Sequence, residues 1–397
     1  MKAHLAGAAT VVALASVPLW LADQYLLSMM TLSGIFIIAA ISLNLLLGYT
    51  GQLSLGHVGF FGIGAYTSAL LALGFDVDLG IGDPVVVDAK PVWAAFVGGI
   101  LMAALFGWLI GKLSFRVRGA YFVIVSVAFA QVMRMIALNW VDLTEGPMAL
   151  SGIPPLSFWL PGQGVVRLTS KGANYWVVLA AGVVAFVLVQ RLVRSRVGRA
   201  LVALRENEAL ARSVGIDVTR YLVVATVVAA AMAGGAGALY AHYVRIVDPD
   251  IFLFIYTVTM VIMVVTGGKG TLTGPLVGGV IFSLLPEILR DYARPEVQWI
   301  LYGVAMILIC TFLPRGIVPA VAEAAQRSFS FEGTLQGRRA AFETAASRPP
   351  HDEDHHSWHE RKSVLDAPHP AERPGAERRD ASRRTHGGAR QIDRPDG

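Results

Sequence analysis

Long apolar runs separated by short polar stretches repeat along the first 320 residues of the chain. A helix rises 1.5 Å per residue, so about 20 apolar residues cross the ~30 Å hydrocarbon core of a bilayer. The runs at 252–266 and 275–289 are short for a full crossing, which tilt or a helix break accommodates. The pattern predicts an all-α polytopic membrane protein with about ten transmembrane helices. The predicted spans are about 3–21, 25–48, 55–73, 92–111, 119–138, 174–190, 221–241, 252–266, 275–289 and 297–313.

The polar stretch 190–220, here called the arginine-rich segment, carries seven arginines between two predicted spans. Loops rich in arginine are retained on the cytoplasmic side of a membrane. With this segment and the N-terminus inside, the inside loops before the tail hold thirteen lysines and arginines against six outside. Because ten is an even number of spans, we expect both termini to be cytoplasmic.

The first apolar run has a second interpretation. Lys2, an apolar stretch and the small residues near 13–16 are also features of a cleavable signal peptide. The run continues to Leu21, however, and a second run follows almost at once. These features favour a membrane span over a signal peptide.

Composition agrees with a membrane protein. The chain is 55% hydrophobic and 15% charged, whereas soluble domains carry about 25% charged residues. A membrane β-barrel would show short alternating segments instead. Cys310 is the only cysteine, which excludes an internal disulfide and a cysteine-based metal site.

Residues 321–397 differ in composition from the rest. They are rich in arginine, glutamate, aspartate, histidine and proline, with equal numbers of basic and acidic residues. Such a segment buries too little apolar surface to offset chain entropy. We therefore expect two parts: a transmembrane domain over 1–320 and a disordered cytoplasmic tail over 321–397. The histidines of HDEDHHSWHE (351–360) are typical of a solvated low-complexity tail or, alternatively, of a weak metal site.

Glycines and uncharged polar residues are concentrated between 44 and 66. Six glycines lie between Gly48 and Gly64, more than close helix packing requires. This density predicts a broken helix whose free backbone groups line a polar path. A satisfied hydrogen bond between helices is the alternative role for each polar side chain. The candidate substrate path consists of Asn44, Gln52, Ser54, His57 and Tyr66.

The chain contains no pattern that would bind ATP. The run 51–57 has suitable glycine spacing but His57 in place of lysine, and Gly270 follows Lys269 where a serine or threonine is required. No nucleophile–base pair or metal cluster is recognisable, so we expect a transport subunit without a cofactor rather than an enzyme. If ATP drives transport, ATP and Mg²⁺ bind to a separate chain.

Few ionisable residues lie within the predicted spans: His57, Arg134, His242 and Glu287. Each is a candidate functional residue, because a charge in hydrocarbon is costly. They form no carboxylate pair or relay, which weighs against a proton-coupled transporter. Sodium coupling through backbone carbonyls stays open, as does a passive channel for a small neutral solute.

Within the arginine-rich segment, residues 203–214 have the pattern of one amphipathic helix. Leu204, Ala211 and Val214 fall on one side, and Arg205 and Arg212 fall with Glu208 on a charged face. Such a helix suits the groove of a protein partner. The alternative is a helix lying on anionic lipid.

Several segments together resemble the branched-chain amino-acid ABC transporter permeases, in particular the subunit type that pairs with a second, homologous permease. The resemblance covers about 30–318. The segments are SLNLLLGYTGQLSLGHVGFFGIGAYTSALL (42–71), RVRGAYFVIVSVAFAQVMR (116–134), LSGIP (150–154), GRALVALRENEALARSVGID (198–217), AGGAGALYAH (233–242), GGKGTLTGPLVGG (267–279) and FLPRGI (312–317).

The resemblance implies a multi-pass permease of the bacterial inner membrane. It implies import driven by two cytoplasmic ABC ATPases, together with a second homologous permease and an extracytoplasmic substrate-binding protein; nucleic acid is not an expected partner. It also implies that the arginine-rich segment is the ATPase-coupling loop. The residues assigned to that loop are Arg199, Arg205, Glu206, Glu208, Ala209, Arg212 and Gly215.

The chain departs from the family pattern at two places. The interval from Glu208-Ala209 to Gly215 is one residue longer than in many ABC importers. Glu145 and Pro147 stand in an outer loop where the family commonly has LTGG, a difference that bears on binding-protein docking and substrate identity. A same-family permease for urea, short amides or sugars, and an ion-coupled secondary transporter, are the alternative functions.

Overall fold

The chain divides into two units, Met1–Ser330 and Phe331–Gly397, and all residues described below belong to the first unit. The predicted tail lies outside the described residues from 324 onward, as do most of the predicted span 3–21 and about half of the predicted span 297–313. The computed structural model describes residues 12–18, 20, 23–77, 85–115, 121–160, 164–290, 297, 300, 303–304, 307–308, 311–313 and 315–323.

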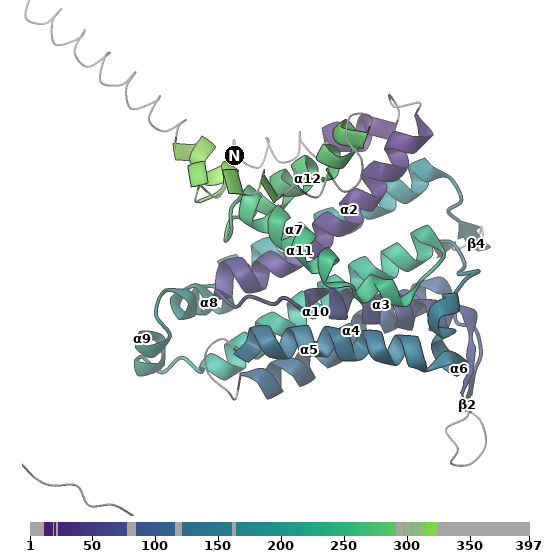
Figure 1. Cartoon of the computed structure of the whole chain (residues 1–397), viewed down its shortest axis with the longest axis horizontal. Coiled ribbons are helices and arrows are strands. Elements are labelled where there is room, and N and C mark those ends of the chain that lie inside the picture. Colours follow the sequence, from purple (N-terminus) through teal and green to yellow (C-terminus); the bar gives the residue numbers. More distant parts are fainter. Residues whose placement is uncertain are drawn as a thin grey trace, which may run out of the picture. The chain divides into compact units, whose positions relative to one another are not determined.

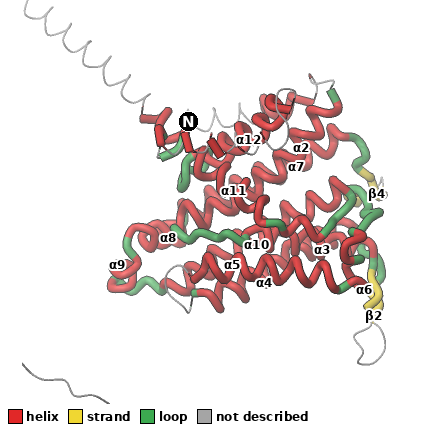
Figure 2. The backbone as a smooth tube through the Cα atoms, viewed as in Figure 1, coloured by secondary structure: helices red, strands yellow, loops and turns green. Residues whose placement is uncertain are grey.

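Helices make up most of the described chain (Figure 2). All eight predicted spans between 25 and 289 coincide with a helix. Their bounds are α2 Gln24–Asn44 with the π-helical turn η1 Leu45–Thr50, α3 His57–Leu73, α4 Val92–Ser114, α5 Tyr121–Asn139, α7 Lys171–Arg194, α10 Val218–Val244, α11 Phe254–Gly267 and α12 Gly274–Arg290.

Five of these helices are long and apolar enough to cross a membrane, within the part of the chain that is described. Three apolar helices are shorter: His57–Leu73, Phe254–Gly267 and Gly274–Leu285. The first of them is separated from η1 by a stretch without regular secondary structure, 51–54, and a turn at 55–56. The predicted helix break is therefore present within the glycine-rich region, and the polar path along it stays a prediction.

The helices pack in two groups around α10. Helices α3, α4 and α10 pack against one another with α5 beside α3, and α2 contacts α7, α11 and α12 as well as α10 (Figure 1). Helix α10 is the most enclosed of the five long helices: 72% of its most apolar 18-residue stretch is buried, compared with 17% for α7. Its run of alanine and glycine allows this burial, because small residues let helix backbones approach closely.

Glycines mark the tightest contacts between helices. A Cβ added at Gly64 of α3 would overlap the backbone of Gly234 in α10, and one added at Gly107 of α4 would overlap Ala230. A Cβ at Gly278 would overlap the Met263 carbonyl of α11. Small residues at these positions therefore let the helix backbones approach closely.

The connections gather at two opposite ends of the helices (Figure 1). One end carries α8 Arg196–Glu206 and α9 Glu208–Ser213. The other carries α6 Val141–Thr144, the turn η2 Gly146–Met148 and two antiparallel hairpins. The hairpins are β1 Phe75–Val77 with β2 Val85–Val87, and β3 Ser157–Leu160 with β4 Gly164–Arg167; η3 Pro249–Phe252 precedes α11.

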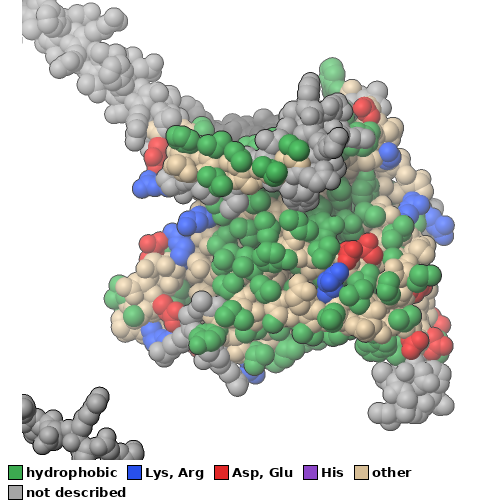
Figure 3. Space-filling view, in the orientation of Figure 1, with side chains coloured by type: hydrophobic (Ala, Val, Ile, Leu, Met, Phe, Trp, Pro, Cys, Tyr) green, Lys and Arg blue, Asp and Glu red, His purple; other side chains and the backbone are tan. Residues whose placement is uncertain are grey.

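Hydrophobic side chains cover the middle of the visible face, and most charged side chains lie nearer its two ends (Figure 3). Large apolar residues such as Leu101, Leu105 and Ile124 are more than half exposed. An apolar belt of this kind is what lipid requires of a helix surface. The placement agrees with a membrane-embedded protein whose charged loops lie outside the hydrocarbon.

Candidate functional site

The arginine-rich segment folds as two short helices joined by a break. Helix α8 begins after Ser195, whose hydroxyl caps the helix by accepting from the backbone N–H of Val197 and Gly198. It ends at Glu206, and Asn207 adopts an extended conformation before capping α9 through the Leu210 N–H. The predicted single helix over 203–214 is therefore wrong, because Asn207 serves better as an N-cap than as a residue inside a helix.

Only part of the predicted apolar side is buried. Leu204 and Ala211 pack in a small cluster with Val218 and Leu222 at the start of α10. Val214 is 70% exposed, so its predicted place in that cluster is wrong. The break at Asn207 rotates α9 relative to α8, so one helical period does not describe both. Leu210 is also exposed, at 62%, which leaves an apolar tip on α9.

The charged residues of this segment pair locally. Arg205 lies 2.6 Å from Glu206, and Arg212 lies 3.1 Å from Glu208 one turn earlier. Arg199 donates to the carbonyl of Arg194 at 3.3 Å. Exposed ion pairs of this kind contribute only about 0–1 kcal/mol each. The charges of Glu208 and Arg212 are therefore available to a partner at small cost.

The turn from α9 into α10 depends on Gly215. Its φ is +87°, and no atom lies within 4 Å of an added Cβ. The glycine is therefore required by its backbone conformation rather than by close packing. Asp217 follows and caps α10 by accepting from the Arg220 N–H. Ala209 lies on the exposed surface between these features.

The candidate path residues lie along the broken helix, but no hydrogen bond or ring contact among the described residues joins them: Tyr66 stacks on Phe252 of η3, nine residues beyond His57. Asn44, Ser54, His57 and Tyr66 are buried, and Gln52 is half-buried. The start of α3 is held by two hydroxyls from other helices. The Ser126 Oγ of α5 accepts from the Gly56 N–H at 3.3 Å, and the Thr257 Oγ1 of α11 accepts from the Val58 N–H at 3.1 Å.

Asn44 joins α2 to the loop between α11 and α12. Its Nδ2 donates to the Thr271 carbonyl at 2.8 Å, and its Oδ1 accepts from the Gly270 N–H at 2.9 Å. Asn44 is 1% exposed. Both ends of the amide are therefore used between segments far apart in sequence, the interhelical role weighed as the alternative to a solute contact.

His57 is buried against Ser42 of α2. The His57 Nε2 lies 2.7 Å from the Ser42 Oγ, which itself donates to the Ala39 carbonyl at 2.6 Å. Because the single hydroxyl hydrogen is used on Ala39, the Nε2–H of neutral His57 donates to Ser42. The His57 Nδ1, the Ser54 Oγ and the Tyr66 hydroxyl have no hydrogen-bond partner among the described residues. These three polar atoms are the free groups of the candidate path.

Two of the other ionisable candidates, Arg134 and His242, have structural partners. Arg134 forms a 2.9 Å ion pair with Asp250 of η3. The Nε2 of His242 lies 2.8 Å from the Ser68 Oγ, and its Nδ1 lies 2.8 Å from the Pro154 carbonyl. The side chain of Glu287 lies outside the described residues. The sequence did not predict the contacts of Ser42 with His57, Thr257 with Val58 and Asp250 with Arg134, because the two residues of each pair lie on different segments of the chain.

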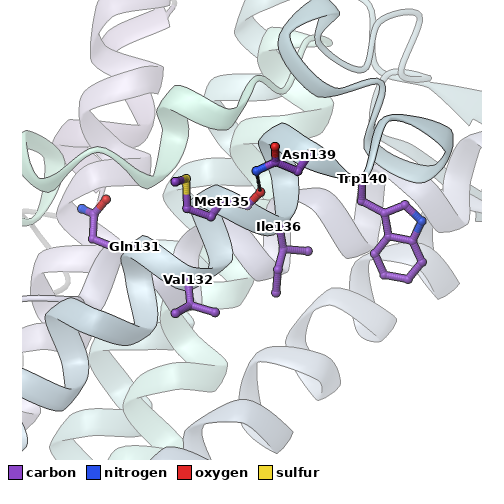
Figure 4. Close-up of a pocket in the computed structure, with 6 residues that line it drawn as sticks. All are labelled: Gln131, Val132, Met135, Ile136, Asn139 and Trp140. Atoms are coloured by element: carbon purple, nitrogen blue, oxygen red, sulfur yellow. Dashed lines mark hydrogen bonds between the residues drawn. The ribbon is translucent and has the colours of Figure 1, made fainter.

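An open hollow of about 570 Å³ lies on the surface of α5 (Figure 4). Four of its lining side chains are apolar, and the Asn139 amide turns back to donate to the Met135 carbonyl at 2.7 Å. The lining contains none of the candidate path residues. The residues that line it are Gln131, Val132, Met135, Ile136, Asn139 and Trp140.

Known proteins resemble most of this chain. The family model described as branched-chain amino acid transport system / permease component matches residues 25–310. The high-affinity branched-chain amino acid transport system permease protein LivM of Salmonella typhimurium is 32% identical over 313 residues, covering 73% of this chain and 69% of that protein.

LivM of Escherichia coli K12 is 32% identical over 317 residues, covering 73% of this chain and 69% of that protein. The permease protein LivH of Escherichia coli K12 is 28% identical over 306 residues, covering 74% of this chain and 94% of that protein. No solved structure gives a significant match.

Proposed function

Because the chain belongs to the family of branched-chain amino acid transport system permeases, we propose that it is the membrane permease subunit of an ATP-driven ABC importer for branched-chain or related amino acids. The observation that carries this proposal is the family match over 25–310. The relatives named above are permeases for branched-chain amino acids, which supports the same substrate class here.

The proposed placement is the inner membrane of a bacterial cell, with ten spans and both termini in the cytoplasm. Two observations support it. Helices α8 and α9 lie at the end of the helices opposite to the two hairpins (Figure 1). The arginine-rich segment that contains them is the strongest cytoplasmic signal in the chain.

The proposed partners are two cytoplasmic ABC ATPases, a second homologous permease and an extracytoplasmic binding protein. ATP and Mg²⁺ belong to the ATPases in this proposal. The exposed stretch from Arg205 to Leu210 supports docking of an ATPase, since it presents charges and one apolar side chain away from the helices. Glu208, Ala209 and Gly215 belong to the same contact.

In the proposed cycle, ATP binding closes the ATPase dimer and moves α8 and α9. This movement shifts the equilibrium of the permease toward an outward-open state, and the binding protein then releases its amino acid. Hydrolysis resets the permease. The shift cannot exceed the difference in free energy with which ATP binds the two states.

The proposed solute path runs by the broken helix between η1 and α3. The free Ser54 Oγ, His57 Nδ1 and Tyr66 hydroxyl support this placement, together with the half-buried Gln52. The Asn44 amide does not add support, because both of its ends are bonded to the 270–271 loop. Uncharged groups suit a solute that must leave again, because they offer hydrogen bonds without strong electrostatic attraction.

Reconstitution of the complete complex tests this function. The test uses proteoliposomes that contain both permeases and both ATPases, with the binding protein outside. Those complexes whose ATPases face the lumen are expected to accumulate labelled leucine only when ATP is enclosed in the lumen. Glu208→Lys and Gly215→Arg are expected to lower uptake, because the first reverses a charge on α9 and the second places a large side chain at φ +87°. Unchanged uptake in both variants would remove the coupling assignment. Accumulation by this chain alone under an ion gradient would instead establish a secondary transporter.

A further inference from the structure

The side chain of Arg205 reaches from the end of α8 to the end of η1. Its Nη1 donates to the Gly48 carbonyl at 2.8 Å. The other edge of the guanidinium is held by Glu206, whose Oε1 accepts from Nε at 3.2 Å and from Nη2 at 2.6 Å. Arg205 therefore joins two segments that are 157 residues apart in the sequence.

The Gly48 carbonyl is available because the helix ends there. In a continuous α-helix it would accept from the Gln52 N–H. Here the N–H groups of Gly51 and Gln52 both donate to the Leu46 carbonyl, and Gly51 has φ +74°. The guanidinium thus supplies a donor and a positive charge at a helix C-terminus, where both are stabilising.

Three glycines make room for this contact. A Cβ added at Gly51 would lie 3.1 Å from the Arg205 Cγ, and one added at Gly270 would lie 2.8 Å from the Arg205 Nη1. A Cβ at Gly48 would overlap the Gly270 backbone. Asn44 fixes the same Gly270 loop to α2. The end of α8, the end of η1 and the α11–α12 loop therefore meet at one side chain.

Arg205 also stands between the surface of α8–α9 and the broken helix. It is followed by Glu206 and by the break at Asn207. On the other side, Gly48 is followed by the stretch 51–56, which leads to buried His57. The hydrogen bond from Arg205 to the Gly48 carbonyl therefore links the end of α8 to the start of that stretch.

We propose that Arg205 is the positioning residue that transmits movement of α8 and α9 to the break between η1 and α3, through its hydrogen bond to the Gly48 carbonyl. This inference rests on the proposed function. It adds a specific role for one residue: without the bond, the ATPase still hydrolyses ATP, but its movement no longer reaches the solute path.

The test compares Arg205→Lys with Arg205→Met in the complete reconstituted complex. Both replacements keep a long unbranched side chain, but only lysine retains a donor and a charge. Leucine uptake and ATP hydrolysis are measured in the same vesicles. Arg196→Met, at an exposed position at the start of the same helix, controls for loss of one arginine.

We expect Arg205→Met to lower leucine imported per ATP by about tenfold, the factor that corresponds to one hydrogen bond made by a charged group. Arg205→Lys is expected to keep most of the wild-type ratio, and Arg196→Met all of it. Equal ratios in the lysine and methionine variants would overturn the proposal. The proposal would also be overturned if the Arg205→Lys complex assembled and the Arg205→Met complex did not, since Arg205 would then be needed for assembly and not for transmission of movement. Absence of ATP-driven import by the wild-type complex would refute the proposed function itself, before the variants are compared.

Discussion

Removal of the Asn44 amide gives the sharpest test of how the broken helix is held. Asn44→Ala deletes both hydrogen bonds between α2 and the α11–α12 loop, at 2.8 Å to the Thr271 carbonyl and 2.9 Å from the Gly270 N–H. It also leaves these two backbone groups unpaired at a site where the side chain is 1% exposed. Buried unpaired groups are costly, so the variant is expected to be destabilised.

The magnitude follows from the two bonds. Side-chain hydrogen bonds between membrane helices average about 0.6 kcal/mol and reach about 1.7 kcal/mol. A buried group left without its partner costs about 1–3 kcal/mol. Two such bonds at a fully enclosed site place the loss near 2–3 kcal/mol. For a helical domain of about 300 residues, the melting temperature should then fall by about 3–5 °C.

Asn139→Ala is the matched control. Asn139 lies at the end of α5, and its amide makes one local bond to the Met135 carbonyl at an exposed position. Alanine is the better helix former, so the stability is expected to stay within about 0.5 kcal/mol of the wild type. Thermal unfolding of the purified protein in detergent, followed by tryptophan fluorescence, measures both variants.

The reasoning fails if Asn44→Ala and Asn139→Ala melt at the same temperature. Reduced transport with unchanged stability in Asn44→Ala would also contradict it. That result would assign Asn44 to the solute path rather than to the packing of the loop.

Two further predictions concern packing at α3. Gly237→Ala is expected to lower the melting temperature, because the added Cβ would overlap the Phe61 carbonyl. Gly235→Ala in the same helix is the control, since its Cβ would meet its nearest atom at 3.4 Å, and it is expected to be neutral or stabilising. Equal melting temperatures of the two variants would refute this prediction. His57→Ala is expected to lower the free energy of unfolding by about 2–4 kcal/mol, because it removes buried volume and the 2.7 Å bond to Ser42. Denaturant or thermal unfolding measures the loss, and His57→Gln is expected to recover part of it. A His57→Ala protein as stable as the wild type would contradict a packing role for His57.

Much of the fold follows from residues that act locally. The apolar runs predicted the eight helices between 25 and 289, and the glycines between 48 and 64 predicted the break between η1 and α3. The packing surfaces at Gly107 and Gly278 were also predictable. Each of these features depends on the character of a short stretch, which periodicity and residue size report directly.

The candidate site was predictable only in outline. The charge of the arginine-rich segment marked it as a candidate docking element, but the pattern over 203–214 missed the break at Asn207 and misplaced Val214. An asparagine is tolerated both inside a helix and at its N-cap. The packing of Leu204 and Ala211 against the start of α10 decides between the two.

The chain's own residue pattern is sufficient to specify an apolar helical protein with its basic loop at one end, because each span must be apolar to enter lipid and loops rich in arginine are held back from crossing it. It does not specify that Arg205 meets Gly48, or that Asn44 meets a loop 226 residues away. Those contacts arise from the angles and offsets at which the helices pack. They depend on complementary side-chain shapes across the whole bundle, which no local stretch of sequence encodes.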